Sequence, residues 1–257
     1  MSIPSDDRGL LLADGLFETL LWRDGGPVDF HTHADRLRRG CAALGLPAPT
    51  AAQLTDAVAA VVGAAPAEGS AFAVRLTWTA GSGGRGLGRP AEPSPRLVAA
   101  AFPAPEREGP ARLATSSIRR NPHSPTSRLK TLAYLDNVMA RREALAAGAD
   151  EALMLNTRGE VACAAAANLF WIEEDRLMTP ALDVGVLDGV TRGRVLAAAS
   201  AVGLRAEECA VPAERLASAT GMFLTNSLIG VRPVGSLDGR PVSPHPAVAR
   251  LAAAAGV

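Results

Sequence analysis

Short strand-like runs alternate with longer helix-like segments along this sequence, and that alternation constrains the fold more than any other feature. Residues 16–22 predict a strand, and residues 33–44 predict a helix that Gly45 caps. Residues 50–62 open on a Thr-x-x-Gln capping box and predict a second helix. Because the two kinds of element alternate and no segment repeats, we expect a mixed α/β protein.

The sequence divides into two predicted domains on either side of an irregular, proline-bearing segment. Strands are expected at residues 71–79 and 96–102, and a glycine-rich loop at 81–86 lies between them. We expect a small N-terminal α/β domain at 1–118, a linker at 119–126 and a larger C-terminal domain at 127–257.

The second half is expected to begin with a helix from residue 131 to residue 148. If that segment is helical, Lys130 and Tyr134 lie one helical turn apart. Further strands are predicted at 151–155, 160–163, 168–172, 176–178 and 222–224, and a further helix at 191–201.

Composition excludes several classes of function. The chain has 257 residues, is 48% apolar and carries no formal net charge, so neither nucleic acid nor a membrane surface is an expected partner. No apolar run approaches membrane-spanning length, and the polar N-terminus fits neither a signal peptide nor a transit peptide, which indicates a cytoplasmic protein. The widely spaced Cys41, Cys163 and Cys209 predict neither a disulfide framework nor a metal site.

Lys130 is the single lysine among 26 lysine and arginine residues. Arginine pairs with carboxylates and phosphates at least as well as lysine does, but it stays protonated, whereas lysine can form a Schiff base with an aldehyde. The only tyrosine, Tyr134, follows four residues later. An amine and a phenol on one face indicate a site, although a lone lysine is more often simply solvated.

Several segments offer donors to the phosphate of an aldehyde cofactor such as pyridoxal phosphate. Gly189 directly precedes a predicted helix start, where unpaired backbone NH groups and the helix dipole favour an anion. Residues 225–227 (Thr-Asn-Ser) offer hydroxyls after a strand, and Arg36 offers a guanidinium fork. Each also has a plain alternative: a loop-to-helix junction, a turn or a solvated arginine. The loop at 81–86 lacks a following Lys-Ser/Thr pair and is not a P-loop.

Together and in this order, these motifs resemble those of the class IV aminotransferases, the fold-type IV pyridoxal-phosphate enzymes. The likeness covers nearly the whole chain, and it is carried by residues 13–20, 33–37, 130–137, 148–152, 168–170, 189–192 and 224–227. The resemblance implies a two-domain fold like that of D-amino acid aminotransferase, pyridoxal 5′-phosphate in the interdomain cleft, and a homodimer.

The resemblance also implies roles for individual residues. Lys130 falls at the lysine that forms the Schiff base and acts as general acid and base, and Tyr134 falls near the 3′-oxygen of the cofactor. Cys163 falls beside the pyridine nitrogen. The phosphate contacts fall on Arg36, on the amides of Val190 and Thr191, and on Ser227 with the adjoining amide of Leu228.

Within the family, the loops at 81–86, 120–123 and 165–171 resemble those of aminodeoxychorismate lyase, which would place the chain in folate precursor supply. That enzyme converts the small-molecule amine 4-amino-4-deoxychorismate to 4-aminobenzoate and pyruvate. A transaminase of D-amino or branched-chain amino acids is the alternative, and a cofactor-binding protein with weak catalysis is a second. The candidate substrate-pocket residues are Phe17, Arg85, Thr225 and Asn226.

Three departures from the family pattern bear on the chemistry. The family has a glutamate that keeps the pyridine nitrogen protonated where this chain has Cys163, and a thiol in an apolar setting does not supply that charge. Glu160 is expected to point to the opposite face of the strand and so not to substitute for that glutamate. Ala80 replaces an arginine of the lyases, which leaves Arg85 as an alternative carboxylate contact. An N-terminal edge strand found in relatives is expected to be absent.

Overall fold

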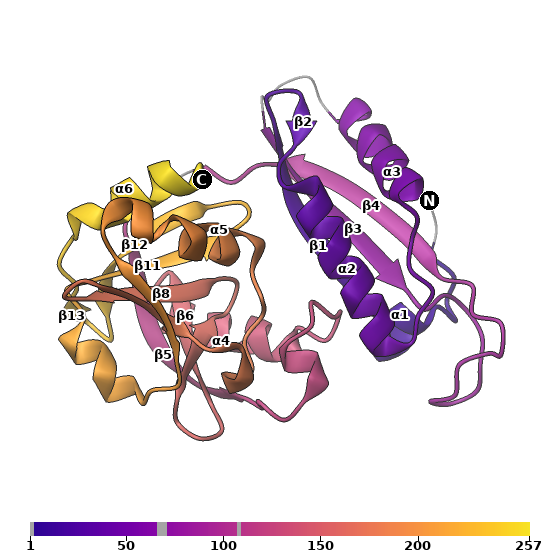
Figure 1. Ribbon diagram of the computed structural model, residues 1–257. Helices are drawn as coiled ribbons and strands as arrows, with labels where there is room; N and C mark the ends of the chain where they lie inside the picture. The colour runs from indigo at the N-terminus through magenta and orange to yellow at the C-terminus, as the bar shows by residue number, and fades with distance from the viewer. Residues whose placement is uncertain (1–2, 66–70, 107–108) are drawn as a thin grey trace. The chain divides into compact units, whose positions relative to one another are not determined.

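The computed structural model describes residues 3–65, 71–106 and 109–257 and divides the chain into two compact units. The first unit runs to Pro105 and also includes Leu129–Ala133, and the second comprises Glu106–Arg128 and Tyr134–Val257. Helices and strands occur in both units, so the prediction of a mixed α/β protein is confirmed (Figure 1).

The first unit is built on an antiparallel sheet in the order β2-β1-β3-β4, with two helices packed against it (Figure 1). Its predicted strands and helices are confirmed. The elements are α1 (Arg8–Leu12), β1 (Gly15–Arg23), β2 (Gly26–Pro27), α2 (Phe30–Leu44), α3 (Ala51–Gly63), β3 (Ala71–Thr79) and β4 (Arg96–Pro103).

Local sequence explains why α2 and α3 begin and end where they do. Gly45 takes a φ of 61° at the end of α2, in the left-handed region that glycine tolerates. At the start of α3, the Thr50 hydroxyl accepts from the Gln53 amide, and the Gln53 side chain accepts from the Thr50 amide. Leu16 and Leu20 of β1 are fully buried beneath these helices, and each contributes about 2 kcal/mol by burial.

The segment that carries Lys130 pairs with the start of β1 and does not form a helix. The Phe17 amide donates to the Lys130 carbonyl at 2.9 Å, and the Leu132 amide donates to the Gly15 carbonyl at 3.0 Å. The following helix, α4 (Leu135–Ala146), begins only after Tyr134. The expected placement of Lys130 and Tyr134 on one helical turn is therefore wrong, because the backbone between residues 130 and 132 is already bonded to β1.

The second unit is built on a large mixed sheet in the order β10-β9-β8-β11-β12-β5-β6-β7, with β13 paired to β12. Its strands are β5 (Ala111–Arg120), β6 (Glu151–Asn156), β7 (Val161–Ala164), β8 (Asn168–Glu173), β9 (Arg176–Pro180), β10 (Arg205–Cys209), β11 (Gly221–Asn226), β12 (Gly230–Leu237) and β13 (Arg240–Pro241). The α-helices that join α4 here are α5 (Val190–Ala198) and α6 (Pro246–Ala255), and short 3₁₀ turns fill the connections at Pro125–Ser127, Leu182–Val184, Ser200–Val202 and Ala213–Ser218.

The sheet of the second unit curls around one of its hydrophobic cores. Side chains alternate along β8: Leu169 and Trp171 join the core that β5, β6, β9, β11 and β12 also line, while Phe170 and Ile172 pack under α5 and α6. The terminal strand β7 also contacts β8 and β9, which brings one end of the sheet round toward its middle. Within the described residues, no helix is both long and apolar enough to cross a bilayer.

Strand β5 differs most from expectation. The predicted linker at 119–126 and the predicted domain limit at 118 would cut this strand, yet β5 runs to Arg120 and pairs with β6 and β12 of the second unit. The residues that follow, up to Arg128, stay in that unit, and the chain then returns to the first unit for Leu129–Ala133. Proline and polar residues around 116–127 resemble a linker because local sequence does not show long-range strand pairing.

Candidate active site

The Lys130 amine in the first unit lies against an aromatic ring and near two guanidinium groups. Its Nζ is 4.3 Å from the centroid of the Phe17 ring, and Cζ of Arg75 is 3.8 Å from the same centroid. Burial is the largest cause that lowers the pKa of Lys130 to about 8; Arg36 and Arg75 lower it further, and Glu18 opposes them. About a tenth of this amine is therefore uncharged at pH 7, far more than for an ordinary lysine.

Strand geometry places these groups together. Phe17 on β1 lies opposite Thr77 of β3, and Arg75 is two residues away on the same face of the sheet, so its guanidinium reaches the Phe17 ring. The Lys130 carbonyl accepts a hydrogen bond from the Phe17 amide. Phe17 was predicted to line a substrate pocket, and the structure places it beneath the amine.

Arg36, the predicted phosphate ligand, is held on the other face of β1 by a buried carboxylate. Glu18 accepts from Arg36 Nε at 2.8 Å and from Arg36 Nη2 at 2.6 Å, and it lies 2.7 Å from Nδ1 of His33. Burial tends to raise the pKa of Glu18, but the hydrogen bonds from Arg36 and His33 outweigh it and hold the pKa at about 2. Glu18 is thus a carboxylate at any physiological pH.

In the second unit, the start of α5 forms a candidate anion cradle. Gly189 is the N-cap residue and has no side chain to occupy the first amides of Val190 and Thr191. A Cβ at Gly189 would lie 2.1 Å from Oδ1 of Asn168, and Asn168 is paired across the sheet with Thr225. The helix start, β8 and β11 therefore meet at one place.

The turn after β11 carries the other predicted phosphate and substrate residues. Oδ1 of Asn226 accepts from the amides of Leu228 and Ile229, both at 2.9 Å, and its Nδ2 donates to the Ala166 carbonyl at 3.0 Å. The Leu228 amide, predicted as a phosphate donor, is therefore already bonded within the turn, and the Asn226 side chain organises two loops. Ser227 lies within the same turn.

Each unit has buried hydroxyls without a hydrogen-bond partner. Among the described residues, these are Oγ of Ser82 and Oγ1 of Thr131 in the first unit and Oγ1 of Thr225 in the second. Buried hydroxyls normally have a partner, so an unpaired one beside a candidate site is informative. A ligand that carries several acceptor oxygens fits such donors.

Cys163 lies on β7, one residue before the end of the strand, and is 6% exposed. Burial raises the pKa of its thiol; the Arg120 guanidinium opposes this, and the Glu151 carboxylate reinforces it. Glu160 accepts from Nδ2 of Asn156 at 2.7 Å and from Nε of Arg158 at 2.8 Å, and so belongs to the β6–β7 turn. Cys163 is a neutral thiol, and the carboxylate three residues away is committed elsewhere.

The glycine-rich loop is held by an arginine that sequence reasoning did not single out. Nη1 of Arg8 donates to the Gly88 carbonyl and Nη2 donates to the Leu87 carbonyl, both at 3.0 Å, while Nε pairs with Asp14. Because the carbonyls turn inward to Arg8, the loop is organised around a cation. Arg85 is exposed on this loop, and Ala80 before it is fully buried.

Sequence reasoning also missed Arg75 and Glu18. The usable signal was a lone charged residue in the middle of an otherwise apolar strand, as in Phe72-Ala-Val-Arg-Leu76 and Leu16-Phe-Glu18. The predicted residues are distributed over both units: Phe17, Arg36, Arg85 and Lys130 lie in the first, and Tyr134, Cys163, Val190, Thr191, Thr225, Asn226, Ser227 and Leu228 lie in the second.

Comparison with known proteins agrees with these motifs. Residues 15–237 match the family described as amino-transferase class IV. A Methanocaldococcus jannaschii protein provisionally named branched-chain-amino-acid aminotransferase is 31% identical over 92% of this chain and 83% of its own. The aminodeoxychorismate lyase of Bacillus subtilis is 28% identical over 90% of this chain and 80% of its own. A solved Legionella pneumophila structure provisionally named 4-amino-4-deoxychorismate lyase matches with a TM-score of 0.90 at 31% identity, covering 98% of this chain and 93% of its own.

Proposed function

Because this chain belongs to the class IV aminotransferase family, a family of pyridoxal-phosphate enzymes, we propose that it eliminates pyruvate from 4-amino-4-deoxychorismate and leaves 4-aminobenzoate. The observation that carries the proposal is the Lys130 amine with its lowered pKa, which contacts the same Phe17 ring as the guanidinium of Arg75. This substrate carries an amine and two carboxylates, and a guanidinium close enough to affect the amine electrostatically suits one of the carboxylates.

The residues present fit a phosphate-bearing aldehyde. Bound pyridoxal phosphate would supply the aldehyde that condenses with an amine and the ring that accepts electrons released at the adjoining carbon. We assign its phosphate to the guanidinium of Arg36, to the helix-start amides of Val190 and Thr191, and to the hydroxyls of Thr225 and Ser227. The unpaired Thr225 hydroxyl supports this assignment.

Lys130 has two roles in the proposed reaction. In its neutral form it would condense with the aldehyde of the cofactor, and once the substrate amine has taken its place, the same group would remove the proton from the carbon that bears that amine and pass it to the enolpyruvyl group, which leaves as pyruvate. A pKa of about 8 suits both roles, because either protonation state is accessible near neutral pH. Phe17 beneath the amine limits its motion and shields one side from water.

Product analysis tests the proposal. The purified protein with pyridoxal phosphate and 4-amino-4-deoxychorismate is expected to release 4-aminobenzoate and pyruvate in equal amounts, measured by chromatography. In a parallel panel, D-alanine, L-leucine and a 2-oxo acid acceptor test for transamination. Keto acid formation with no 4-aminobenzoate would replace the lyase with the transaminase.

The transaminase is the second candidate, and a specific observation favours it. The Methanocaldococcus jannaschii relative provisionally bears that activity in its name. A cofactor-binding protein with weak catalysis is the third candidate, because Cys163 leaves the chain without the ring-pairing carboxylate of the family pattern. It predicts that neither the lyase substrate nor any amine donor changes the absorbance of the bound cofactor.

We also propose that the enzyme is a homodimer. Leu10, Leu11 and Leu12 are exposed on α1 of the first unit, and Leu135 and Val138 are exposed on α4 of the second. Exposed clusters of large apolar side chains are typical of protein interfaces. Sedimentation velocity measures whether the mass is that of one chain or two.

Gly189 gives a test of the phosphate assignment. Replacing it with alanine should displace Asn168 and weaken pyridoxal phosphate binding at least about tenfold, because the added Cβ would lie 2.1 Å from Asn168 Oδ1. The matched control is Gly193→Ala on the same helix, where a Cβ meets nothing within 4 Å. Equilibrium titration of cofactor absorbance measures both, and equal affinities in the two variants would contradict the assignment.

A further inference from the structure

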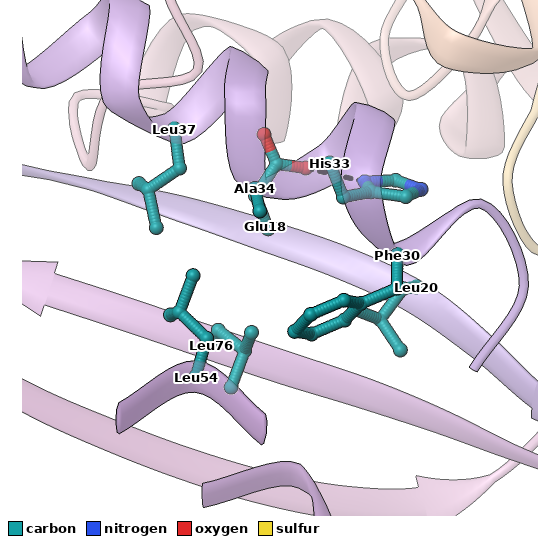
Figure 2. Close-up of a pocket in the computed structure, with 8 residues that line it drawn as sticks. All are labelled: Glu18, Leu20, Phe30, His33, Ala34, Leu37, Leu54 and Leu76. Atoms are coloured by element: carbon teal, nitrogen blue, oxygen red, sulfur yellow. Dashed lines mark hydrogen bonds and ion pairs between the residues drawn. The ribbon is translucent and has the colours of Figure 1, made fainter. Parts of the chain in front are cut away.

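Glu18 is a buried carboxylate that the proposed reaction leaves without a task. It stands in the middle of β1, is 1% exposed, and points to the face covered by α2. Figure 2 shows it beside His33, with the dashed contact between the two side chains and with Leu20, Phe30, Leu54 and Leu76 below it in the view. The pocket around it is lined by Leu20, Phe30, His33, Ala34, Leu37, Leu54 and Leu76.

This setting makes the charge costly to keep. A carboxylate among leucines loses its hydration and persists only where hydrogen-bonded cations compensate. Arg36 binds Glu18 side-on through Nε and Nη2, which fixes the plane of the guanidinium as well as its position. His33 occupies the Oε2 side as a further partner. The arrangement therefore specifies one orientation of Arg36.

The same carboxylate acts on Lys130 from the opposite face of the strand. The charged groups that act on the Lys130 amine include Arg36 from α2, Arg75 from β3 and Glu18 from β1. The two arginines disfavour the ammonium form, and Glu18 favours it. Removing the Glu18 charge would therefore leave the effect of the two arginines less opposed.

We propose that Glu18 is a positioning residue whose carboxylate fixes the guanidinium of Arg36 and supplies the negative charge that balances the two arginines acting on Lys130. This role of Glu18 rests on the proposed function only in that the phosphate-bearing ligand is taken to be pyridoxal phosphate. The charge role belongs to the chain itself and is testable without catalysis.

The single lysine makes a direct measurement possible. Full-length protein freed of cofactor is acetylated with a trace of acetic anhydride at a series of pH values between about 6 and 10. Acetylated Lys130 blocks trypsin, so the labelled product is the peptide 129–141, separate from the N-terminal peptide 1–8 that carries the α-amino group. The yield of the labelled peptide against pH gives the titration midpoint of Lys130.

Glu18→Gln should move that midpoint down by about one pH unit, because it removes a nearby negative charge and leaves both arginines. The matched control is Asp35→Asn, which removes a negative charge from α2 at an exposed pair with Arg38 and should leave the midpoint unchanged. Circular dichroism establishes that each variant is folded before it is labelled.

Glu18→Asp separates charge from orientation. It keeps the negative charge, but the shorter side chain cannot reach both Nε and Nη2 of Arg36 in the same geometry. We expect a wild-type labelling midpoint together with a several-fold smaller preference for pyridoxal phosphate over pyridoxal in equilibrium binding. Glu18→Gln should lose the same preference. If the Glu18→Gln protein does not fold, because Arg36 and His33 lose the carboxylate that they bind, the Glu18→Asp protein still tests the proposal.

Two results would overturn the proposal. One is a folded Glu18→Gln protein whose Lys130 midpoint matches wild type, and the other is a Glu18→Asp protein whose phosphate preference matches wild type. Both readouts are independent of 4-aminobenzoate formation. If the wild-type protein makes no 4-aminobenzoate but the Glu18→Gln variant shows the shifted midpoint, the lyase proposal is rejected and the proposed role of Glu18 stands.

Discussion

Replacing Lys130 with arginine is expected to lower turnover at least about a thousandfold and to abolish covalent attachment of the cofactor. Arginine keeps the charge and much of the length of lysine, but its guanidinium stays protonated and does not condense with an aldehyde. The pKa of about 8 makes the contrast larger, because it raises the fraction of free amine at neutral pH roughly 300-fold over an ordinary lysine. Turnover and cofactor absorbance are both measured.

Arg128 provides a control for the Lys130→Arg variant within the same segment. Arg128 is exposed and two residues away, so Arg128→Lys adds an amine without touching the β1 pairing and should leave turnover within about twofold. The double variant Lys130→Arg with Arg128→Lys restores the lysine count but not its position, and it should remain inactive. Substantial turnover in either variant that lacks Lys130 would show that the reaction does not depend on an amine at that position.

Local motifs predicted the local structure well. Gly45 and the Thr50–Gln53 capping box specify helix ends through interactions within a few residues, and both were predicted. Strand β5 was missed because its identity comes from pairing with β6 and β12, which are distant in sequence. The same reason explains the error at Lys130, where pairing with β1 overrides a helical reading of the sequence.

The candidate site divides in the same way. Lys130 stood out by residue type, and Gly189 stood out as the residue before a helix start. Glu18 and Arg75 were not chosen, because their importance comes from burial and from which face of the strand they occupy. Sequence alternation places Phe17 and Glu18 on opposite faces, but only the fold shows that one lies under the amine and the other under α2.

Cys163→Glu is expected to raise turnover about tenfold in the cofactor-loaded enzyme. The family pattern has a glutamate at this position that pairs with the ring nitrogen, and a buried neutral thiol supplies no such charge. A carboxylate there would favour a protonated ring, which accepts electrons more readily. The cofactor-free variant should be less stable than wild type, because a carboxylate placed where Cys163 is 6% exposed has lost its hydration. Bound cofactor should restore the stability.

Cys163→Gln is the control that separates charge from size. Glutamine has nearly the volume of glutamate but no charge, so it should add strain among Ala162, Ala165 and Met154 without improving turnover. Steady-state rates and the absorbance spectrum of the bound cofactor are compared for the three proteins. If the glutamate variant is folded, binds cofactor and turns over no faster than wild type, the thiol is not what limits the reaction. In that case the cofactor ring must accept the electrons released in the reaction without a carboxylate at this position. Cys163 would then be tested for an effect on the choice between elimination and transamination, not on the rate.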